Sequence, residues 1–575
     1  MKASAPGEYS LSLETVLASA ALLYFIKCSL DFPFDPDLFM MLRTGWEMVH
    51  HGLPVYDTFA WPPLSCKVPW VDYQWLAHVI IYTVYSVGGF TGTVIYKTIL
   101  YGASFFVLFW WSRGRYGLLP SLAALLVAVY LGRWFLSPRP MAYSAVFFPL
   151  LAYLLIDLQQ KPLSWRHFLV LPLMFVFWGN LHGGFVIGLV IMGAGFALLS
   201  YQKMREGAPL KGFLLSLGLL WLLCFLGSAL VNPYGWKNFR YVIDFLYFRP
   251  VFMRSASDME SPFLRLAFNT HYFAIIALTI AALILFFMRY RLKPSPMELL
   301  IYCFWLVASL RAARNMQLFS TASIPMLSFI FFHGGALLSR NRHYQELVAF
   351  FARRPALPSV AKIAALFFII LSFTLHCAAL DLSGQGLEHA LFPVGMKDFL
   401  LSNDLPERLY CHDIVGTYFL WYLYPRYKVS IDVRWNNVYT DAYFEEIQRS
   451  FFDSATFFRF VEKHDLDVVV VHYKYHPAFI ERDSSWVLLY EGERARLFLR
   501  NTEKNREILG KFWRDELAYP DIPDVNAFLY RTFIERKNYE AAKKYLRRLI
   551  IASPGEEMLW RHSRELDRLM EKEAQ

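Results

Sequence analysis

Residues 112–167 read SRGRYGLLPSLAALLVAVYLGRWFLSPRPMAYSAVFFPLLAYLLIDLQQKPLSWRH, and this pattern decides the fold. Two apolar runs of about twenty residues follow each other, the length of helix needed to cross about 30 Å of hydrocarbon. Basic loops precede the first run and follow the second, while the turn GRWFLSPRP (132–140) separates them. The stretch therefore predicts a pair of membrane-spanning helices that begins and ends on the same side of a bilayer.

The composition extends this pattern to most of the chain. Of 575 residues, 56% are hydrophobic and 18% are charged, whereas globular proteins average about 45–50% and about 25%. The formal charge of +10 is explained by Lys and Arg in loops beside the membrane, because no basic-aromatic motif of a nucleic-acid reader appears. Eleven spans are predicted, at about 11–30, 92–111, 117–136, 140–157, 166–180, 184–201, 212–231, 271–289, 297–311, 315–333 and 361–380.

The basic loops orient these spans, because positive residues favour the cytoplasmic side. Keeping those loops inside requires the segment from residue 74 to about 91 to lie along the interface as an amphipathic helix, instead of crossing. The run 11–30 is then a retained first span with a cytoplasmic N-terminus, and everything after about Asp381 is outside. The outer face receives loop 31–91, the turns 132–140, 178–184 and 311–315, loop 232–270 and the C-terminal part.

Three domains are predicted: a transmembrane domain (1–380), an extracytoplasmic α/β domain (381–500) and a helical tail (501–575). Strands are expected at 427–433, 467–473, 486–492 and 494–500, with helices between them, which is typical of a small α/β domain. In the tail, NYEAAKKYLRRLIIASPGEEMLW (538–560) fits either one tetratricopeptide-like helical hairpin or a helical cap on the α/β domain.

Acidic residues stand directly after the first span, at Asp31, Asp35 and Asp37. In one interpretation Pro36 opens a helix with Asp35 as its N-cap. In the other, the carboxylates act as a general base or as a metal-binding pair at the membrane surface, where unsolvated charge is costly unless it is used. A second acidic cluster in another outer loop holds Asp258 and Glu260.

Arginines mark two of the predicted outer turns, Arg133 and Arg139 in the first and Arg311 and Arg314 in the second. The planar guanidinium fork suits a lipid that carries a phosphate or diphosphate. The alternative is that these long side chains reach ordinary lipid headgroups from the helix ends. Further candidates for contacts with a substrate are the polar and aromatic residues Trp70, Asp72, Gln74, Asn180 and His182.

No P-loop, dinucleotide fingerprint, GxSxG or HExxH motif stands in a suitable context, which argues against a nucleotide-driven pump. The chain resembles membrane glycosyltransferases of the GT-C fold, specifically bacterial relatives of the protein O-mannosyltransferases that use polyprenyl-phosphate sugars. The resemblance rests on the acidic DPD after the first span, the long first outer loop and the soluble C-terminal domain. More narrowly, it resembles a bacterial group whose motifs here read DPDLFMMLRTG (35–45), WVDYQWL (70–76), NLHGG (180–184) and NPYGW (232–236).

The resemblance implies a GT-C fold and an inverting transfer of a sugar from a lipid-phosphate carrier to an acceptor hydroxyl in the bacterial inner membrane. By position, Asp37 or Asp35 would be the base, and Glu260 or Asp258 the acid of a later outer loop. The four arginines would stabilise the departing phosphate. It leaves open whether a divalent cation, Mg²⁺ or Mn²⁺, is bound by Asp35 and Asp37. The acceptor can be protein, lipid or glycan.

Two other functions are compatible with the same sequence. A transporter of lipid-linked glycans would need polar residues deep in its spans and related halves, but the spans contain few charges apart from Lys97. A non-catalytic scaffold for envelope-glycan assembly would depend on residues 501–575 and not on Asp37.

Overall fold

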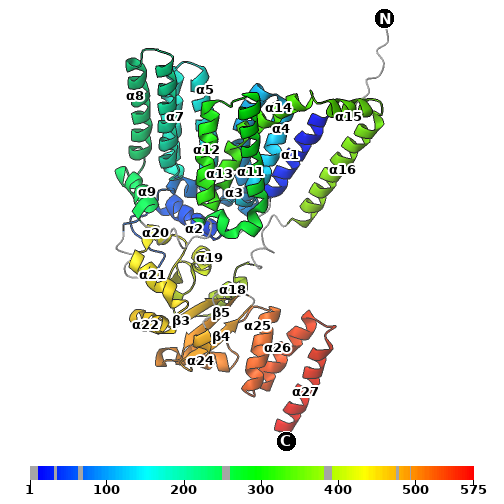
Figure 1. Cartoon of the computed structure of the whole chain (residues 1–575). Coiled ribbons are helices and arrows are strands. Elements are labelled where there is room, and N and C mark those ends of the chain that lie inside the picture. The colour runs from blue at the N-terminus through cyan, green and yellow to red at the C-terminus, as the bar shows by residue number, and fades with distance from the viewer. Residues whose placement is uncertain are drawn as a thin grey trace. The chain divides into compact units, whose positions relative to one another are not determined.

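The computed structural model describes residues 11–30, 35–61, 69–248, 259–380, 391–473, 478–492 and 494–574. The chain forms two compact units (Figure 1). The helix unit comprises Met1–Pro33 and Val71–Ser383, and the sheet unit comprises Phe34–Trp70 and Gly384–Gln575. The chain therefore passes between the units three times, and residues 34–70 belong to the same unit as the C-terminal part.

Each of the eleven predicted spans is covered by helix. At two of them, 117–136 and 315–333, the helix consists of two consecutive segments. The helices of the helix unit are α1 (Leu13–Leu30), α3 (Trp75–Tyr116), α4 (Leu118–Gly132), α5 (Met141–Gln160), α6 (Trp165–Leu181), α7 (Phe185–Arg205), α8 (Lys211–Leu230), α9 (Trp236–Phe248), α11 (Leu266–Tyr290), α12 (Pro296–Arg311), α13 (Met316–Ala322), α14 (Ile324–Leu338), α15 (Arg342–Ala352) and α16 (Ala356–Ala379). Short 3-10 turns η2 (Arg133–Phe135), η4 (Pro262–Arg265) and η5 (Ala313–Asn315) join some of them.

Length and hydropathy mark the helix unit as a multi-pass membrane domain. Within the described residues, 8 helices are long and apolar enough to cross a bilayer, or 9 if the bent pair is one span, in which Ala313–Ala322 meets Ile324–Leu338 at 49°. Helices α6 and α12 are shorter, with 17 and 16 residues. The count of eleven spans stays a prediction.

Helix α3 changes direction at Gly89, where the backbone adopts φ 58° and ψ −153°. A positive φ of this kind is open mainly to glycine. The two arms lie close together where they flank the kink, since a Cβ on Gly92 would stand 3.1 Å from the carbonyl oxygen of Val84. The break divides the helix where the sequence predicted an interfacial segment to end and a span to begin. That the first arm lies in the interface stays a prediction.

One end of the helix unit gathers the turns that the charge pattern assigns to the cytoplasm. The Tyr116 hydroxyl donates to Glu298 at 3.0 Å. Ser295 donates to Gln159 at 2.8 Å, and Gln159 donates to Gln202 at 3.2 Å. The ends of α3, α5 and α7 and the start of α12 are thus joined by polar contacts, as expected if these turns share one side of a bilayer.

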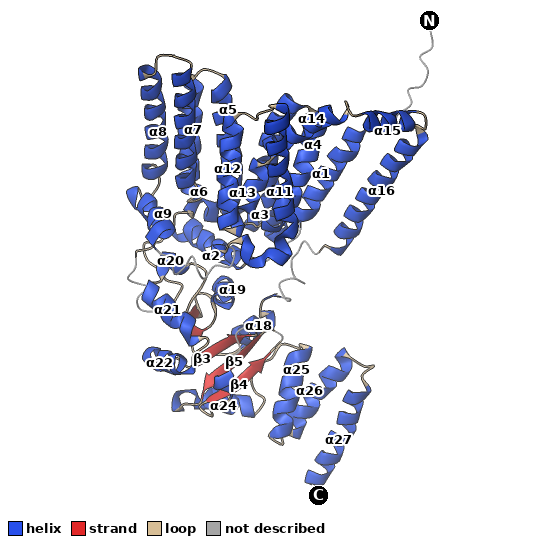
Figure 2. Ribbon diagram, in the orientation of Figure 1, coloured by secondary structure: helices blue, strands red, loops and turns tan. Residues whose placement is uncertain are grey.

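The sheet unit contains a five-stranded mixed sheet (Figure 2). The strand order is β2-β1-β3-β5-β4, with parallel β1–β2 and β1–β3 pairs and antiparallel β3–β5 and β4–β5 pairs. The strands are β1 (Arg408–Tyr410), β2 (Lys428–Val429), β3 (Val468–His472), β4 (Trp486–Glu491) and β5 (Ala495–Arg500). Its helices are α2 (Pro36–His51), α18 (Val394–Ser402), α19 (Asp413–Leu423), α20 (Trp435–Val438), α21 (Asp441–Ser450), α22 (Ser454–His464), α23 (Ala478–Glu481), α24 (Arg506–Trp513), α25 (Pro523–Glu535), α26 (Tyr539–Ala552) and α27 (Glu557–Ala574).

Residues 34–70 are built into this unit by apolar contacts and backbone pairing. The Phe39 ring of α2 meets Tyr418 of α19 edge to face, with centroids 5.2 Å apart. Trp61 donates from its indole nitrogen to the Leu409 carbonyl at 3.1 Å. Ala60 forms a parallel bridge with Val429. The sequence analysis treated 31–91 as one loop of the transmembrane domain, whereas the structure divides it at Trp70 and Val71.

The tail continues the sheet unit. Tyr519 donates to the Leu489 carbonyl at 2.8 Å, and Arg531 of α25 pairs with Glu491 of β4 at 2.9 Å. Farther along, Lys543 pairs with Asp567 at 2.7 Å and joins α26 to α27. The tail thus consists of helices whose first member, α25, contacts the edge strand β4. The choice between a tetratricopeptide-like hairpin and a helical cap stays a prediction.

Candidate functional site

The acidic DPD motif begins helix α2 in the sheet unit. Asp35 is the N-cap, its carboxylate accepts from the Asp37 backbone nitrogen at 3.1 Å, and Pro36 occupies the first turn. The capping interpretation is therefore confirmed for Asp35, and it uses one carboxylate oxygen. Asp37 lies in the first turn, where the helix dipole favours a negative charge. Asp31 and Asp258 lie outside the described residues. The catalytic roles predicted for these acids stay predictions.

The DPD motif also bears on the divalent cation left open above. No group of three or more His, Cys, Asp or Glu residues that could bind a metal occurs in the described ranges. Asp35 and Asp37 alone offer two neighbouring carboxylates. Mg²⁺ is often bound by one or two carboxylates and completes its shell with water and substrate phosphates. The pair therefore fits Mg²⁺ or Mn²⁺ bound together with a phosphate, and not a site made by protein ligands alone.

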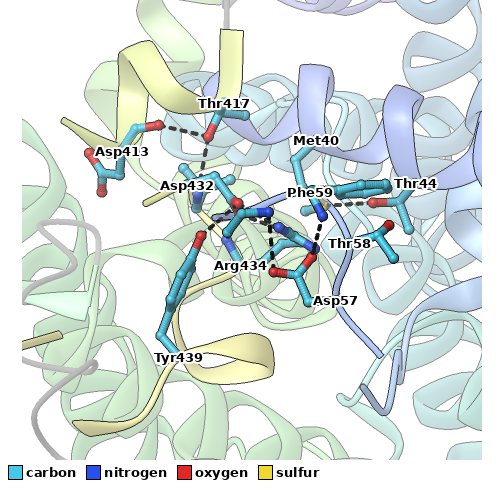
Figure 3. Close-up of polar contacts among 12 residues, drawn as sticks. Met40, Thr44, Asp57, Thr58, Phe59, Asp413, Thr417, Asp432, Arg434 and Tyr439 are labelled. Atoms are coloured by element: carbon cyan, nitrogen blue, oxygen red, sulfur yellow. Dashed lines mark hydrogen bonds and ion pairs between the residues drawn. The ribbon is translucent and has the colours of Figure 1, made fainter. Parts of the chain in front are cut away.

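An arginine cluster that was not predicted from the sequence joins Asp57 to the C-terminal part of the sheet unit (Figure 3). Arg434 donates to Asp57 at 2.7 Å and to the two oxygens of Asp432 at 2.8 and 2.6 Å. The Tyr439 hydroxyl also donates to Asp432, at 2.9 Å. Burial disfavours the guanidinium charge, but Asp432 and Asp57 outweigh it and raise the pKa of Arg434. We name Asp57, Asp432, Arg434 and Tyr439 the arginine cluster.

Trp70, a predicted substrate contact, lies against this cluster. The Arg434 guanidinium stacks 4.8 Å from the centre of its ring and 4.6 Å from that of Phe59. Trp70 is buried, and its packing on a paired arginine is sufficient to account for its position. Sequence spacing could not reveal the cluster, because Asp57 and Arg434 are 377 residues apart.

In the helix unit, two of the quoted motifs are joined by a direct hydrogen bond, and a second bond leads to the residue before NPYGW. Trp75 donates from its indole to the Asn180 side-chain oxygen at 2.8 Å, and Asn180 donates to the Val231 carbonyl at 2.8 Å. A Cβ added to Gly183 would stand 3.2 Å from the Tyr73 ring, so the turn packs closely on the start of α3. We name this region, where WVDYQWL, NLHGG and NPYGW meet, the motif junction. Asn180 joins its parts.

The protonation of His182 follows from its hydrogen bonds. Trp178 donates from its indole to the Ser144 hydroxyl oxygen at 2.7 Å, so the hydroxyl proton is available for His182 Nδ1, 2.7 Å away. The Gly184 backbone nitrogen also donates to Nδ1, at 3.1 Å. A neutral His182 therefore carries its proton on Nε2 and presents an N–H donor. Burial, and then the charge of Arg314, lower the pKa of His182 to about 3 and keep it neutral.

Arg314 and Glu260 belong to the same part of the helix unit. The Ala313 nitrogen donates to the Glu260 carbonyl at 2.9 Å, and Arg314 approaches the sulfur of Met259 at 3.3 Å. The turn 311–315 and the loop at 259–261 are therefore neighbours. The charge of Arg314 also acts on His182.

Arg133, Arg139 and Arg311 are the other predicted arginines. Arg133 lies over the Tyr130 ring, 3.9 Å from its centre, and donates to the Tyr130 carbonyl. Arg139 is half-buried in the turn before α5, and Arg311 is exposed at the end of α12. Tyr130 also lines an apolar groove with a volume of about 390 Å³. Its lining residues are Tyr24, Leu126, Val127, Tyr130 and Ile275.

Asp72 and Gln74 stand at the start of helix α3. Asp72 is paired with His78, which was not among the predicted site residues. The Gln74 nitrogen donates to one Asp72 oxygen at 3.0 Å. His78 Nδ1 lies 2.7 Å from the other oxygen. Both side chains are buried, at 0% and 1% exposure. The available sequence signal for this pair was an aspartate just before the start of a helix and a histidine six residues later, in the first turn of that helix.

No protein-family model and no curated protein matches this sequence. Among solved structures, the chain is similar to the archaeal oligosaccharyltransferase AglB from Archaeoglobus fulgidus in complex with an inhibitory peptide and a dolichol-phosphate, at TM-score 0.44 and 12% identity over 85% of this chain and 74% of that one. It is also similar to a crystal structure of the Archaeoglobus fulgidus oligosaccharyltransferase with Zn and sulfate, at TM-score 0.44 and 12% identity over 80% and 68%. Likeness at this level is too remote to assign a function. The fold defines a multi-pass membrane protein with a mixed-sheet domain.

Proposed function

We propose that this protein transfers a glycosyl unit from a polyprenyl-phosphate carrier to an acceptor hydroxyl on the extracytoplasmic face of a membrane. The observation that carries the proposal is that His182 accepts at Nδ1 from Ser144 and from the Gly184 nitrogen, which leaves an Nε2–H donor at the motif junction, where the charge of Arg314 also acts. Together, a guanidinium and an N–H donor form a site for an anion. Phosphate is the anion that arginine binds best through its planar fork.

In this proposal Arg314 and His182 hold the phosphate that leaves when the sugar is transferred. Negative charge develops on that phosphate as its bond to the anomeric carbon breaks, and donors already in place stabilise it without reorganising. Because His182 is neutral with its proton on Nε2, it donates without adding a charge that would need a counter-ion. The apolar groove that Tyr130 lines suits an isoprenoid chain, and Arg133, stacked on the same ring, offers a further contact for its phosphate end.

The acceptor hydroxyl needs a base, and Asp37 is our first choice. One oxygen of Asp35 already caps helix α2. Glu260 is the predicted acid that lies in the helix unit beside the Arg314 turn, and Arg139 and Arg311 remain secondary phosphate contacts. Asp35 and Asp37 remain the residues that would bind a divalent cation.

Native mass spectrometry of detergent-purified protein tests the proposal. The wild type should retain a polyprenyl phosphate or its glycoside. Arg314→Ala should lose it, because the guanidinium is gone, while Asp37→Asn should keep it, because the base is not needed for binding. The matched control is Arg342→Ala. Arg342 is an exposed arginine of α15, and its salt bridge with Glu346 is also exposed.

Two results would contradict the proposal. Retention of only ordinary phospholipids by all four proteins would remove the lipid-donor argument and favour the scaffold function. Loss of the carrier from Arg342→Ala as much as from Arg314→Ala would show that a general effect of charge, and not the motif junction, binds it.

A further inference from the structure

Two buried polar groups at the motif junction are incompletely hydrogen-bonded in the described part of the chain: His78 Nε2 has no partner, and the Tyr234 hydroxyl has only a contact with the Asp72 backbone. Buried groups of this kind are rare, because each gives up hydration without a replacement. Both belong to the surroundings of Asp72. His78 is bonded to it, and burial together with the Asp72 charge raises the pKa of Tyr234.

The state of His78 follows from Asp72. One Asp72 oxygen accepts from the Gln74 nitrogen and the other faces His78 Nδ1. A neutral imidazole that donates from Nδ1 to this carboxylate leaves Nε2 as an acceptor. The phenol of Tyr234, by contrast, can donate. The two groups are therefore complementary to a ligand that can both donate and accept hydrogen bonds.

A sugar meets this requirement, because each hydroxyl donates one hydrogen bond and accepts others. The surrounding residues are fixed, since Trp75 is tied to Asn180 and Tyr73 stacks on Tyr241 with centroids 5.2 Å apart. We propose that His78 and Tyr234, with Asp72 as the positioning residue, bind hydroxyl groups of the sugar carried by the lipid donor. This inference rests on the proposed function and adds the residues that recognise the sugar, as distinct from the phosphate.

Binding measurements on the full-length protein in detergent test this assignment. The probes are a polyprenyl phosphate without sugar and its phosphoryl-mannose and phosphoryl-glucose forms, titrated by native mass spectrometry. His78→Asn keeps a donor for Asp72 but cannot reach the position of Nε2. Tyr234→Phe removes only the hydroxyl. The control is Tyr302→Phe, which removes another buried tyrosine hydroxyl of the helix unit.

We expect the wild type to bind at least one glycosylated probe about tenfold more tightly than the bare phosphate, and both variants to lose that difference. Their affinity for the bare phosphate should stay within about twofold of wild type, which also shows that they are folded. Tyr302→Phe should match the wild type. If His78→Asn fails to fold, Tyr234→Phe decides alone.

The contrary results separate the two proposals. If both variants keep the preference for the glycosylated probe, the sugar is bound elsewhere and this inference is wrong, while the proposed function stands. Equal wild-type affinity for bare and glycosylated probes has the same meaning. If the wild type binds none of the probes, the proposed function fails and this inference fails with it.

Discussion

The arginine cluster of the sheet unit and the Asp72–His78 pair of the helix unit both bury aspartates beside a basic side chain, yet they differ in completeness. Arg434 uses Nε, Nη1 and Nη2 on two carboxylates, and Tyr439 adds a further donor to Asp432. His78 uses Nδ1 and leaves Nε2 without a partner among the described residues. A closed network fixes architecture, whereas an open pair keeps one group available for a ligand.

The two histidines of the motif junction extend this comparison. His182 accepts at Nδ1 from Ser144 and Gly184 and so presents a donor at Nε2. His78 donates a hydrogen bond from Nδ1 to Asp72 and so presents an acceptor at Nε2. The same residue type is set to opposite hydrogen-bonding roles by what its Nδ1 meets. A phosphate needs the first role and a hydroxyl can use the second.

The largest effect is expected from Arg434→Met. The change leaves Asp57 and Asp432 buried without their cation, which costs about 3–5 kcal/mol. Urea pulse proteolysis, mapped to the sheet unit by mass spectrometry, measures the loss in the free energy of unfolding. Arg561→Met is the control, because its pair with Glu557 is exposed and contributes about 0–1 kcal/mol. A loss no larger than that of the control would mean that the cluster does not hold the unit together.

A smaller effect is expected from Asp72→Asn. The hydrogen bond to His78 loses its charged acceptor, and about 1–3 kcal/mol of the free energy of unfolding of the helix unit should be lost. SDS titration followed by circular dichroism measures it, with Asp244→Asn, half of an exposed pair with Arg240, as the control. A loss equal to that of Arg434→Met would remove the contrast, because the pair would then be structural like the cluster.

The smallest effect is a pH dependence that His182 imposes on the helix unit. Its pKa falls from 6.5 to about 3 in the folded protein, so the unfolded chain binds the proton more readily. Stability is unaffected above pH 6.5 and falls as the pH drops below it, by about 1–2 kcal/mol at pH 5. His182→Asn keeps an acceptor for Ser144 but does not titrate there, and its SDS-unfolding profile should be flatter with pH. Parallel profiles would show that His182 is not held neutral.

The sequence allowed the helices to be predicted well, because lipid imposes the same requirement on every span. Each span had to be apolar over its whole length, and basic residues marked alternate ends. Spans such as 140–157 and 184–201 could therefore be predicted without knowing which helices pack against them. The strand at 467–473 was recognisable for a similar reason, since four consecutive valines favour a buried strand.

Other features depended on contacts that no local pattern records. Residues 34–70 join the sheet unit through Asp57 and Trp61, whose partners Arg434 and Leu409 lie 377 and 348 residues away. The candidate site was partly accessible, since His182, Glu260 and Arg314 were named. His78 and Tyr234 were not singled out, because a hydrogen bond that is missing becomes visible only when every neighbour is in place.

The insertion of residues 34–70 in the sheet unit also governs how the protein is made. Asp57 leaves the ribosome 377 residues before Arg434, a delay of about 20–75 s at ordinary rates of synthesis. Through that interval the apolar face of α2 has no partner from its own unit. The first loop can complete its fold only when nearly the whole chain exists, so a product truncated before strand β1 carries an α2 that cannot be buried by its native partners. A chain that ends prematurely therefore exposes the apolar face of α2, a surface of the kind that quality-control proteases recognise.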